Sequence, residues 1–152
     1  MCGIIGITSS KPVSSAIINS LRKLEYRGYD SAGLATLSEG IINEVKSEGR
    51  VENLEKNIAI KNMQGSVGIG HVRWATHGIP NTVNAHPHSS NNVSIVHNGI
   101  IENSTILKKF LISKGHKFKS QTDTEVIVHL ITEYLKENDL KNSIIKMLNQ
   151  LH

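Results

Sequence analysis

The sequence contains very little cysteine and few aromatic residues. Cys2 is the single cysteine in 152 residues, so the chain cannot form an internal disulfide, which excludes a disulfide-stapled secreted scaffold. Aromatic residues make up only 4% of the chain, so aliphatic side chains must fill the core. A chain of this length is ordinarily one domain. We therefore expect a single cytoplasmic domain with an aliphatic core.

Long apolar runs and basic clusters are also missing. No run approaches the ~20 apolar residues that span a bilayer, and the N-terminus lacks the charged and apolar regions of a signal peptide. The net charge is +4, but the lysines are scattered and are not interleaved with aromatic residues. The sequence therefore predicts no membrane partner and no nucleic-acid partner.

Cys2 is the residue around which catalytic chemistry can be built. Only Met1 precedes it, and a small residue at position 2 allows methionine aminopeptidase to remove Met1. The thiol and a free α-amine would then share one carbon, with ordinary pKa values of about 8.5 and 7.7–8.0. Near neutral pH the amine can accept the thiol proton and later protonate a leaving group. The alternative is a cysteine without a role, and these first residues alone do not decide between the two.

Periodicity and turn signals predict a mixture of strands and helices. Strands are expected at residues 2–8, 32–37, 41–46, 66–74 and 93–97, with the second and third forming a hairpin. Helices are expected from Pro12 to 24, at 51–60, at 104–114, from a capping box at 122–125 to about 136, and from Asp139 to the chain end. Strands and helices do not alternate regularly, so the predicted fold class is α+β with antiparallel sheets.

Residues 75–92 form the longest stretch without a period. The stretch contains glycine, two prolines and many asparagine, serine and histidine residues, so we expect a structureless loop. A loop of this length inside a compact domain is usually functional. The strand expected after it ends at Asn98-Gly99, which is a strong turn signal.

Six short motifs make the chain resemble the class II glutamine amidotransferases, which are N-terminal-nucleophile hydrolases. The motifs are MCGIIGI from Met1, LEYRGYDSAG from Leu24, HVRWATHG from His71, NAHPH from Asn84, VHNGIIEN from Val96 and TDTEVI from Thr122. They span nearly the whole chain in the family's order. The second and third motifs are most similar to the members of the class that act on a sugar phosphate.

The resemblance implies a four-layer αββα sandwich that hydrolyses the side-chain amide of L-glutamine to glutamate and ammonia, without a cofactor or a metal. It also implies that residues 1–152 are an incomplete glutaminase domain, truncated at its C-terminal side. Sugar-phosphate isomerase domains would follow it in a longer, homo-oligomeric parent. There the ammonia would serve the conversion of fructose-6-phosphate to glucosamine-6-phosphate.

The resemblance also implies that the sulfur of Cys2 attacks the amide carbon of glutamine. Negative charge then develops on the amide oxygen and needs hydrogen-bond donors. We expect the side-chain NH₂ of Asn98 and the backbone N–H of Gly99 to be these donors. An ordinary hairpin turn is the alternative for an isolated Asn-Gly pair, but the residues that follow, 100–103, also match the family.

An enzyme specific for glutamine should pair both the carboxylate and the ammonium of its substrate. The two-pronged guanidinium of Arg73 can bind the carboxylate, and Asp123 can accept the ammonium. In isolation, Arg73 would be interpreted as a surface charge and Asp123 as a residue of a helix cap.

The residues after Arg73 belong to a loop that closes over glutamine in the family. We therefore expect Trp74, Thr76 and His77 to help bind the substrate and to exclude water. Plain core packing is the alternative for Trp74. Arg27 and Asp30 lie in the other signature loop, and we expect them to support the nucleophile.

Several histidines lie close together in the sequence and raise a zinc-binding alternative. They are His71, His77, His86, His88 and His97. Zinc is disfavoured because there is no second cysteine, the spacing is not the i, i+4 of a metalloprotease helix, and alternation along strands would send some rings to opposite faces. We expect His86 and His97 to hold the long loop and the oxyanion turn through hydrogen bonds.

A non-catalytic fragment is the alternative to an active enzyme. Such a fragment would still bind glutamine or associate with another chain. Without the family's further strands, apolar surface would be exposed and would favour association. The residues expected to form this surface are Ile4, Ile7, Ile69 and Ile95.

Overall fold

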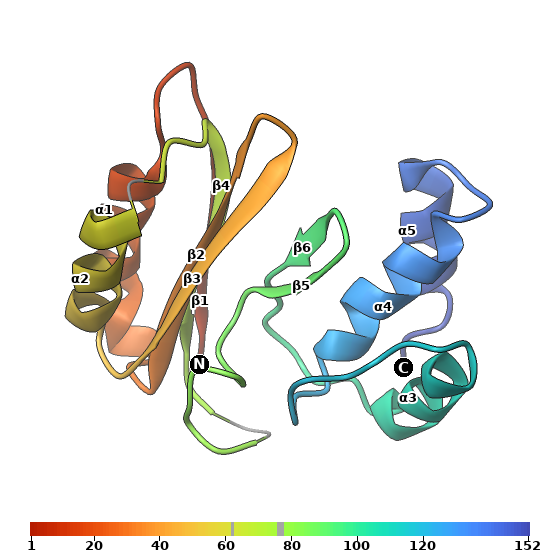
Figure 1. The fold of residues 1–152 in the computed structure, drawn as a ribbon. Helices are drawn as coiled ribbons and strands as arrows, with labels where there is room; N and C mark the ends of the chain where they lie inside the picture. The colour runs from red at the N-terminus through yellow and green to blue at the C-terminus, as the bar shows by residue number, and fades with distance from the viewer. Residues whose placement is uncertain (62, 76–77) are drawn as a thin grey trace.

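A computed structural model of the chain describes residues 1–61, 63–75 and 78–152. The elements stack as helices, sheet, sheet and helices (Figure 1). This is the αββα arrangement that the family resemblance implies. One hydrophobic core lies between each sheet and the helices that cover it.

The larger sheet is antiparallel throughout, with the strand order β1-β4-β2-β3. Its strands are β1 (Gly3–Thr8), β2 (Ser31–Ser38), β3 (Ile41–Glu48) and β4 (Val67–Arg73). Strands β2 and β3 form the predicted hairpin. Gly3 pairs with Val72, which brings the start of β1 beside the end of β4. Gly33 of β2 lies opposite His71 of β4.

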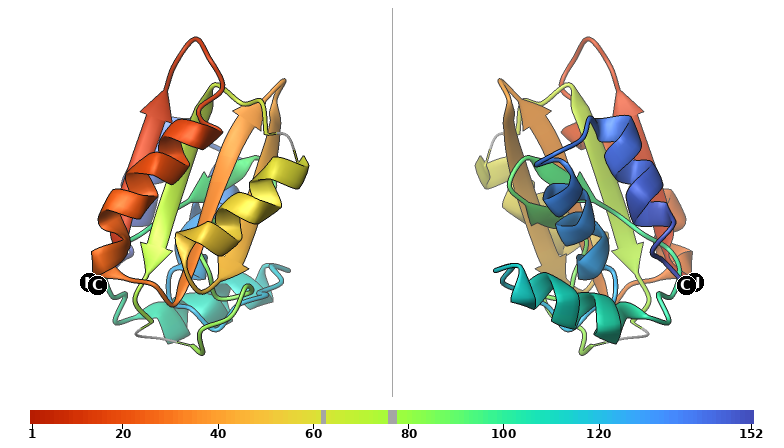
Figure 2. Two further views of the ribbon diagram at one scale, coloured as in Figure 1. Left: turned by 90° about the vertical axis from the view of Figure 1, so that its left-hand side faces the viewer. Right: turned by 90° about the vertical axis from the view of Figure 1, so that its right-hand side faces the viewer.

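Two helices cover the outer face of this sheet (Figure 2), and they are α1 (Ser14–Leu24) and α2 (Val51–Lys61). Apolar residues recur at helical spacing in α1, where Ile17 and Leu21 are fully buried. The first core is almost entirely aliphatic, as the low aromatic content predicts. Its buried members are Val13, Ile17, Ile18, Leu21, Ala32, Leu34, Val45, Val51, Leu54, Met63 and Val72.

Helix α1 begins later than predicted, because the preceding segment continues along a neighbouring strand. Ser9 N–H donates to the Ser66 carbonyl at 2.9 Å, and Val13 N–H donates to the Gly65 carbonyl at 3.0 Å. Pro12 therefore lies before the helix and not in its first turn, which corrects the prediction.

The stretch expected to be structureless contains a strand. Strand β5 (His88–Ser90) pairs with β6 (Val93–Ile95), and β6 ends two residues before the predicted end at residue 97. A two-residue turn joins them, and Asn91 there has a φ of 50°, a conformation that asparagine tolerates. The Ser89 and Ser94 hydroxyl oxygens lie 2.9 Å apart across the pair, within hydrogen-bond distance.

Helices α3 (Ser104–Ser113), α4 (Glu125–Tyr134) and α5 (Leu140–Leu148) complete the last layer. The second core lies between them and the β5-β6 pair, and its buried members are Ile101, Leu107, Leu111, Val126, Ile127, Leu130, Ile131 and Met147. Helix α5 starts after Asp139 as predicted, and the Asp139 side chain caps it by accepting a hydrogen bond from Asn142 N–H at 2.8 Å. The helix ends at Leu148, before the chain end.

The predicted capping box at residues 122–125 does not form. The Glu125 carboxylate accepts from the backbone N–H groups of Lys119 and Ser120, at 2.8 and 2.7 Å, and not from Thr122 N–H. The Thr122 hydroxyl is paired with His88 Nε2 at 2.9 Å. Contacts with the preceding loop and with β5 therefore occupy the two side chains that would have closed the box.

The four isoleucines expected at an exposed apolar surface are not equally exposed. Ile4 is 39% exposed, whereas Ile7, Ile69 and Ile95 are half-buried. Ile7 packs against the first core and Ile95 against the second. The expectation therefore holds for Ile4 only. Across the ranges that the structure describes, no helix is long and apolar enough to cross a bilayer.

Candidate active site

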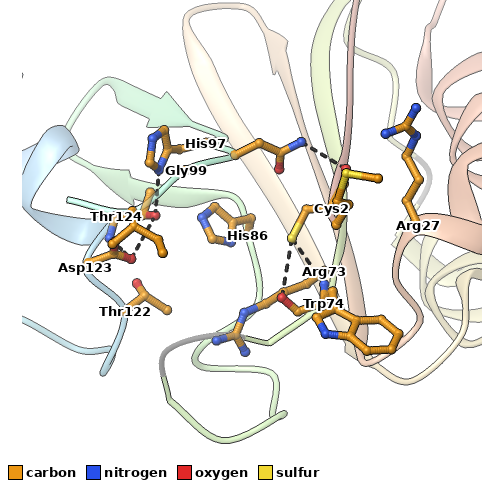
Figure 3. Close-up of a pocket in the computed structure, with 13 residues that line it drawn as sticks. Cys2, Arg27, Arg73, Trp74, His86, His97, Gly99, Thr122, Asp123 and Thr124 are labelled. Carbon is orange, nitrogen blue, oxygen red and sulfur yellow. Dashed lines mark hydrogen bonds between the residues drawn. The ribbon is translucent and has the colours of Figure 1, made fainter. Parts of the chain in front are cut away.

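A cavity of about 370 Å³ lies where the two sheets and their connecting loops meet (Figure 3). This volume is within the range of small-molecule sites. The cavity is lined by Met1, Cys2, Arg27, Arg73, Trp74, His86, His97, Asn98, Gly99, Ile100, Thr122, Asp123 and Thr124. Residues from distant parts of the chain, predicted for one site, are thus brought together.

Cys2 lies directly before β1, and the pairing of β1 with β4 places its sulfur against Trp74. The Trp74 backbone N–H donates to Sγ at 3.2 Å, and the thiol lies 3.5 Å from the Trp74 carbonyl oxygen. An N–H aimed at the sulfur is the contact that a nucleophilic thiolate accepts. Met1 lines the same cavity and is 82% exposed, so it is accessible at the protein surface.

Arg73 ends β4 and is almost completely buried, with 3% of its surface exposed. Its guanidinium donates to the carbonyl oxygens of Gly78 at 3.3 Å and Ile79 at 3.4 Å. Burial lowers the pKa of Arg73, and the nearby Cys2, Asp30 and Asp123 oppose this shift. An arginine remains protonated through such a shift, so the cavity contains a fixed positive charge.

The signature loop around Asp30 holds the backbone on either side of Trp74. Asp30 N–H donates to the Arg73 carbonyl at 3.1 Å, and the Asp30 carboxylate accepts from Ala75 N–H at 2.8 Å. Gly28 packs so closely that an added Cβ would lie 2.5 Å from the Arg73 carbonyl carbon. This loop therefore fixes the segment that contacts the Cys2 sulfur.

Two further loop residues lie at the edge of the cavity. Arg27 Nε donates to the Tyr26 hydroxyl at 3.2 Å, and its guanidinium lies over the Tyr26 ring. Trp74 is 46% exposed and packs edge-on against Tyr29, so its side chain is not a core residue. Thr76 and His77, which were expected to bind substrate, lie outside the described residues.

Asn98 and Gly99 lie in the turn that follows β6. The Asn98 side-chain NH₂ donates to the Cys2 carbonyl at 3.1 Å, and its Oδ1 lies 3.0 Å from His71 Nε2. His97 packs against Gly99, where an added Cβ would lie 2.6 Å from His97 Nε2. His97 Nδ1 also lies 3.2 Å from the Thr124 hydroxyl. The turn is thus held both toward Cys2 and toward the start of α4.

Asp123 connects the same turn to α4. One carboxylate oxygen accepts from Ile101 N–H at 2.7 Å, and the other accepts from Thr124 N–H at 2.9 Å. A carboxylate has about four acceptor sites, so these bonds leave acceptor capacity toward the cavity. Burial lowers the pKa of His97, and the negative charge of Asp123 opposes this shift.

Three histidines gather at one wall of the cavity, which His86 itself lines, although alternation along strands was expected to send some of the histidine rings to opposite faces. The His71 and His86 rings stack with centroids 4.2 Å apart, and His88 packs edge-on against His86 at 4.6 Å. Burial lowers the pKa of His71 to about 4 and that of His88 to about 3. Within the described ranges, no group of three or more His, Cys, Asp and Glu side chains is placed to hold a metal ion.

His86 corrects one prediction about this cluster. Neither of its ring nitrogens has a hydrogen-bond partner in the part of the chain that the structure describes, and only 5% of its surface is exposed. Its ring holds the loop by stacking and not by hydrogen bonds. Burial, reinforced by the neighbouring His71 and His88, lowers the pKa of His86 well below the ordinary 6.5.

The comparison with protein families agrees with this geometry. The family described as the glutamine amidotransferase domain matches residues 56–143, which is more than half of the chain. This chain belongs to the glutamine amidotransferase domain family.

Curated relatives of the amidotransferase domain are much longer than this chain. The glutamine–fructose-6-phosphate aminotransferases of Agrobacterium fabrum and Clostridium acetobutylicum are 48% and 52% identical to it, over 152 and 153 residues. Each alignment covers 99% of this chain but 25% of the relative. The chain thus spans about a quarter of the length of these relatives.

Solved structures place the amidotransferase domain in the expected fold. Glutamine phosphoribosylpyrophosphate amidotransferase from B. subtilis, in complex with ADP and GMP, matches with a TM-score of 0.83 at 29% identity. A structure of the allosteric regulatory enzyme of purine biosynthesis matches with a TM-score of 0.85, also at 29% identity. Each match covers 99% of this chain and 33% of the other. The predicted α+β fold with antiparallel sheets is confirmed.

Sequence reasoning missed some of the residues that shape the cavity of the amidotransferase domain. Thr122 and Thr124 line it and flank Asp123, yet they were considered only as helix-capping residues. His71 was considered only as a possible zinc ligand. His71 is not among the residues that line the cavity but contacts Asn98 behind it. Because residues two apart in a strand face the same side, its spacing from Arg73 was the signal that could have placed it near the site.

Proposed function

We propose that this domain hydrolyses the side-chain amide of L-glutamine, with the Cys2 sulfur as nucleophile, to give glutamate and ammonia. The observation that carries the proposal is the placement of the single cysteine beside Asn98 and Gly99, in a cavity that also contains a buried cation and a carboxylate. Glutamine carries the matching groups, which are an amide, a carboxylate and an ammonium.

The first step requires the free α-amine of Cys2, so Met1 must be removed. The amine accepts the thiol proton as Sγ bonds to the amide carbon, and the electron pair of the C=O bond moves to oxygen. The second N–H of the Asn98 amide and the N–H of Gly99 are proposed to stabilise this oxyanion. Neither group has a hydrogen-bond partner among the residues that the structure describes.

Collapse of the intermediate breaks the carbon–nitrogen bond. The protonated amine of Cys2 gives its proton to the leaving nitrogen, and ammonia departs from a γ-glutamyl thioester. Water then attacks the thioester, the same amine accepts the water proton, and the thiol is restored. Cys2, the oxyanion donors and water therefore account for every bond and proton in these steps.

Substrate specificity is assigned to the two charges in the cavity. Arg73 is proposed to pair with the α-carboxylate of glutamine and Asp123 with its α-ammonium. Trp74, Thr76 and His77 are proposed to close over the substrate, while Arg27, Asp30, His86 and His97 hold the surrounding loops. The hydrogen bonds of Asp30 to the 73–75 segment support its part in this proposal.

The fate of the ammonia is inferred from the longer relatives. Two relatives that are identical to this chain at about half of the aligned positions are named for glutamine and fructose-6-phosphate. We propose that the ammonia serves the conversion of fructose-6-phosphate to glucosamine-6-phosphate, on sugar-phosphate isomerase domains in a longer homo-oligomeric protein. Release of glucosamine-6-phosphate by the longer protein, and its molar mass by light scattering, would test these two points.

Covalent labelling tests the glutaminase proposal. The protein is incubated with the diazoketone analogue of glutamine, and intact mass and peptide mapping locate the adduct. We expect Met1 to be absent, the label to be on Cys2, glutamine to protect, and Cys2→Ala to release no glutamate. Unchanged glutamate release by Cys2→Ala would contradict the mechanism. Processed protein that is neither labelled nor active would support the non-catalytic alternative.

A further inference from the structure

His71 contacts the side chain that the proposed mechanism uses as an oxyanion donor. Its Nε2 lies 3.0 Å from Oδ1 of Asn98, on the opposite side of the amide from Cys2. His71 is fully buried in β4, so neither water nor substrate competes for this contact. The ring therefore lies behind the oxyanion turn, and Asn98 separates it from the cavity.

The orientation of the Asn98 amide follows from its other contact. The amide nitrogen lies 3.1 Å from the Cys2 carbonyl oxygen, which can only accept a hydrogen bond. Rotating the amide by 180° would place two acceptor oxygens against each other. Nδ2 must therefore face Cys2, and Oδ1 must face His71.

The same contact specifies the tautomer of His71. Because Oδ1 is an acceptor, Nε2 of His71 must carry the proton that lies between them. Nδ1 has no hydrogen-bond partner in the described part of the chain, so leaving it unprotonated avoids a buried orphan donor. Burial lowers the pKa of His71 to about 4, so the ring is neutral near pH 7 and the single proton is on Nε2.

Packing fixes the plane of the His71 ring. It stacks on His86 with an interplanar angle of 21°, and the His86 backbone is seated directly against Gly33. His71 is paired with Gly33 across β2 and β4, so no side chain on β2 displaces the stack. The donor direction of Nε2 is thereby set by two neighbouring elements.

We infer that His71 is a positioning residue that donates from Nε2–H to Oδ1 of Asn98 and thereby holds the N–H bonds of that amide toward Cys2 and the cavity. This inference rests on the proposed glutaminase function, because Asn98 matters only if an oxyanion forms beside it. His71 does not touch the reacting atoms. Its effect should therefore be on the rate of the chemical step and not on the affinity for glutamine.

The first test compares His71→Leu with His71→Gln in the processed protein. Leucine removes the donor, whereas the Nε2 of glutamine occupies a place close to that of the imidazole and restores it. We expect His71→Leu to lower kcat for glutamate release by about 10–10²-fold with little change in KM, because one oxyanion donor loses its orientation. His71→Gln should recover most of this loss.

A matched control separates positioning from general destabilisation. His88 is another buried, neutral histidine of the same cluster, but it contacts Thr122 and not Asn98. His88→Leu should lower the unfolding temperature about as much as His71→Leu does while leaving kcat close to wild type. In an Asn98→Ala background, His71→Leu should have no further effect on kcat. If His71→Leu lowers kcat by the same factor in the Asn98→Ala protein as in the wild-type protein, the inference is overturned.

A second measurement does not depend on turnover. In ¹⁵N-labelled wild-type protein, the imidazole nitrogen shifts of His71 report its tautomer, and we expect the Nε2–H form. The Asn98 side-chain amide signals should shift in His71→Leu but not in His88→Leu. The Nδ1–H tautomer, or unchanged Asn98 signals in His71→Leu, would refute the contact. Wild-type protein with the expected tautomer but no glutaminase activity would instead refute the proposed function.

Discussion

Replacing Gly33 with alanine should disturb the candidate site from a distance. An added Cβ at Gly33 would lie 2.1 Å from the His86 carbonyl oxygen, and that oxygen belongs to the backbone and cannot rotate away. The His86 segment must therefore move by about 1 Å to reach a tolerable contact. Overpacking of this kind typically costs about 1–3 kcal/mol in the free energy of unfolding. A domain of this size would then unfold roughly 2–12 °C lower.

The same displacement of the His86 segment should also slow the reaction at Cys2. His86 stacks on His71, and His71 contacts the Asn98 amide, so a shift of His86 changes the orientation of a proposed oxyanion donor. A misplacement of about 1 Å can reduce a rate by roughly 10²-fold. We therefore expect Gly33→Ala to slow the labelling of Cys2 by the diazoketone analogue, measured by intact mass over time.

Gly6→Ala is the matched control for this prediction. Gly6 lies in β1 of the same sheet, and an added Cβ there would meet no atom within 4 Å. The unfolding temperature of Gly6→Ala, followed by circular dichroism, should equal that of the wild type or be slightly higher, because alanine is favoured over glycine by about 0.5–1 kcal/mol in a strand. If Gly33→Ala and Gly6→Ala have the same unfolding temperature and the same rate of Cys2 labelling, the reasoning about the contact between Gly33 and the His86 backbone is wrong.

Three further predictions follow from the site. Asp123→Asn loses the charge and one of the two backbone contacts, because an amide has a single acceptor oxygen, so KM for glutamine should rise about 10–100-fold in a glutamate-release assay. An unchanged KM would argue against ammonium binding there. His86→Phe should cost less than about 1.5 kcal/mol in urea unfolding because it keeps the stack, whereas His86→Ala should cost about 2–5 kcal/mol, and equal losses would contradict stacking. The folded-state pKa values of His71 and His88, about 4 and about 3, lie below the ordinary 6.5. The free energy of unfolding should therefore be highest above pH 6.5 and fall by about 1.4 kcal/mol per histidine per pH unit below it. Urea midpoints that do not change from pH 7.5 to 5 would refute this.

Local patterns predicted the elements whose own residues decide their structure. The β2-β3 hairpin follows from two apolar runs around a short turn, and the Asp139 cap follows from a single side chain and a nearby N–H. Family motifs brought Cys2, Arg73 and Asn98 into one proposed site. The structure forms the hairpin and the helix start where they were predicted, and it places Cys2, Arg73 and Asn98 around one cavity.

The errors arise where a distant element competes for the same groups. Pro12 is kept out of the helix because its neighbours bond to residues 65–66, and the Thr122 hydroxyl is paired with His88 of β5. His86 stacks on another ring because Gly33, far away in sequence, leaves room for its backbone. Such contacts are set by the pairing of strands in space, which the periodicity of one segment does not encode.

The candidate cavity lies between two halves of the molecule, each of which has its own hydrophobic core. Cys2 and Arg73 come from one end of the larger sheet, whereas Asn98 and Asp123 come from the layer built around the second core. Either half could fold without producing a competent site. Selective reaction at Cys2 therefore reports that the two halves are packed against each other. Its loss during gentle denaturation would mark their separation before either core unfolds.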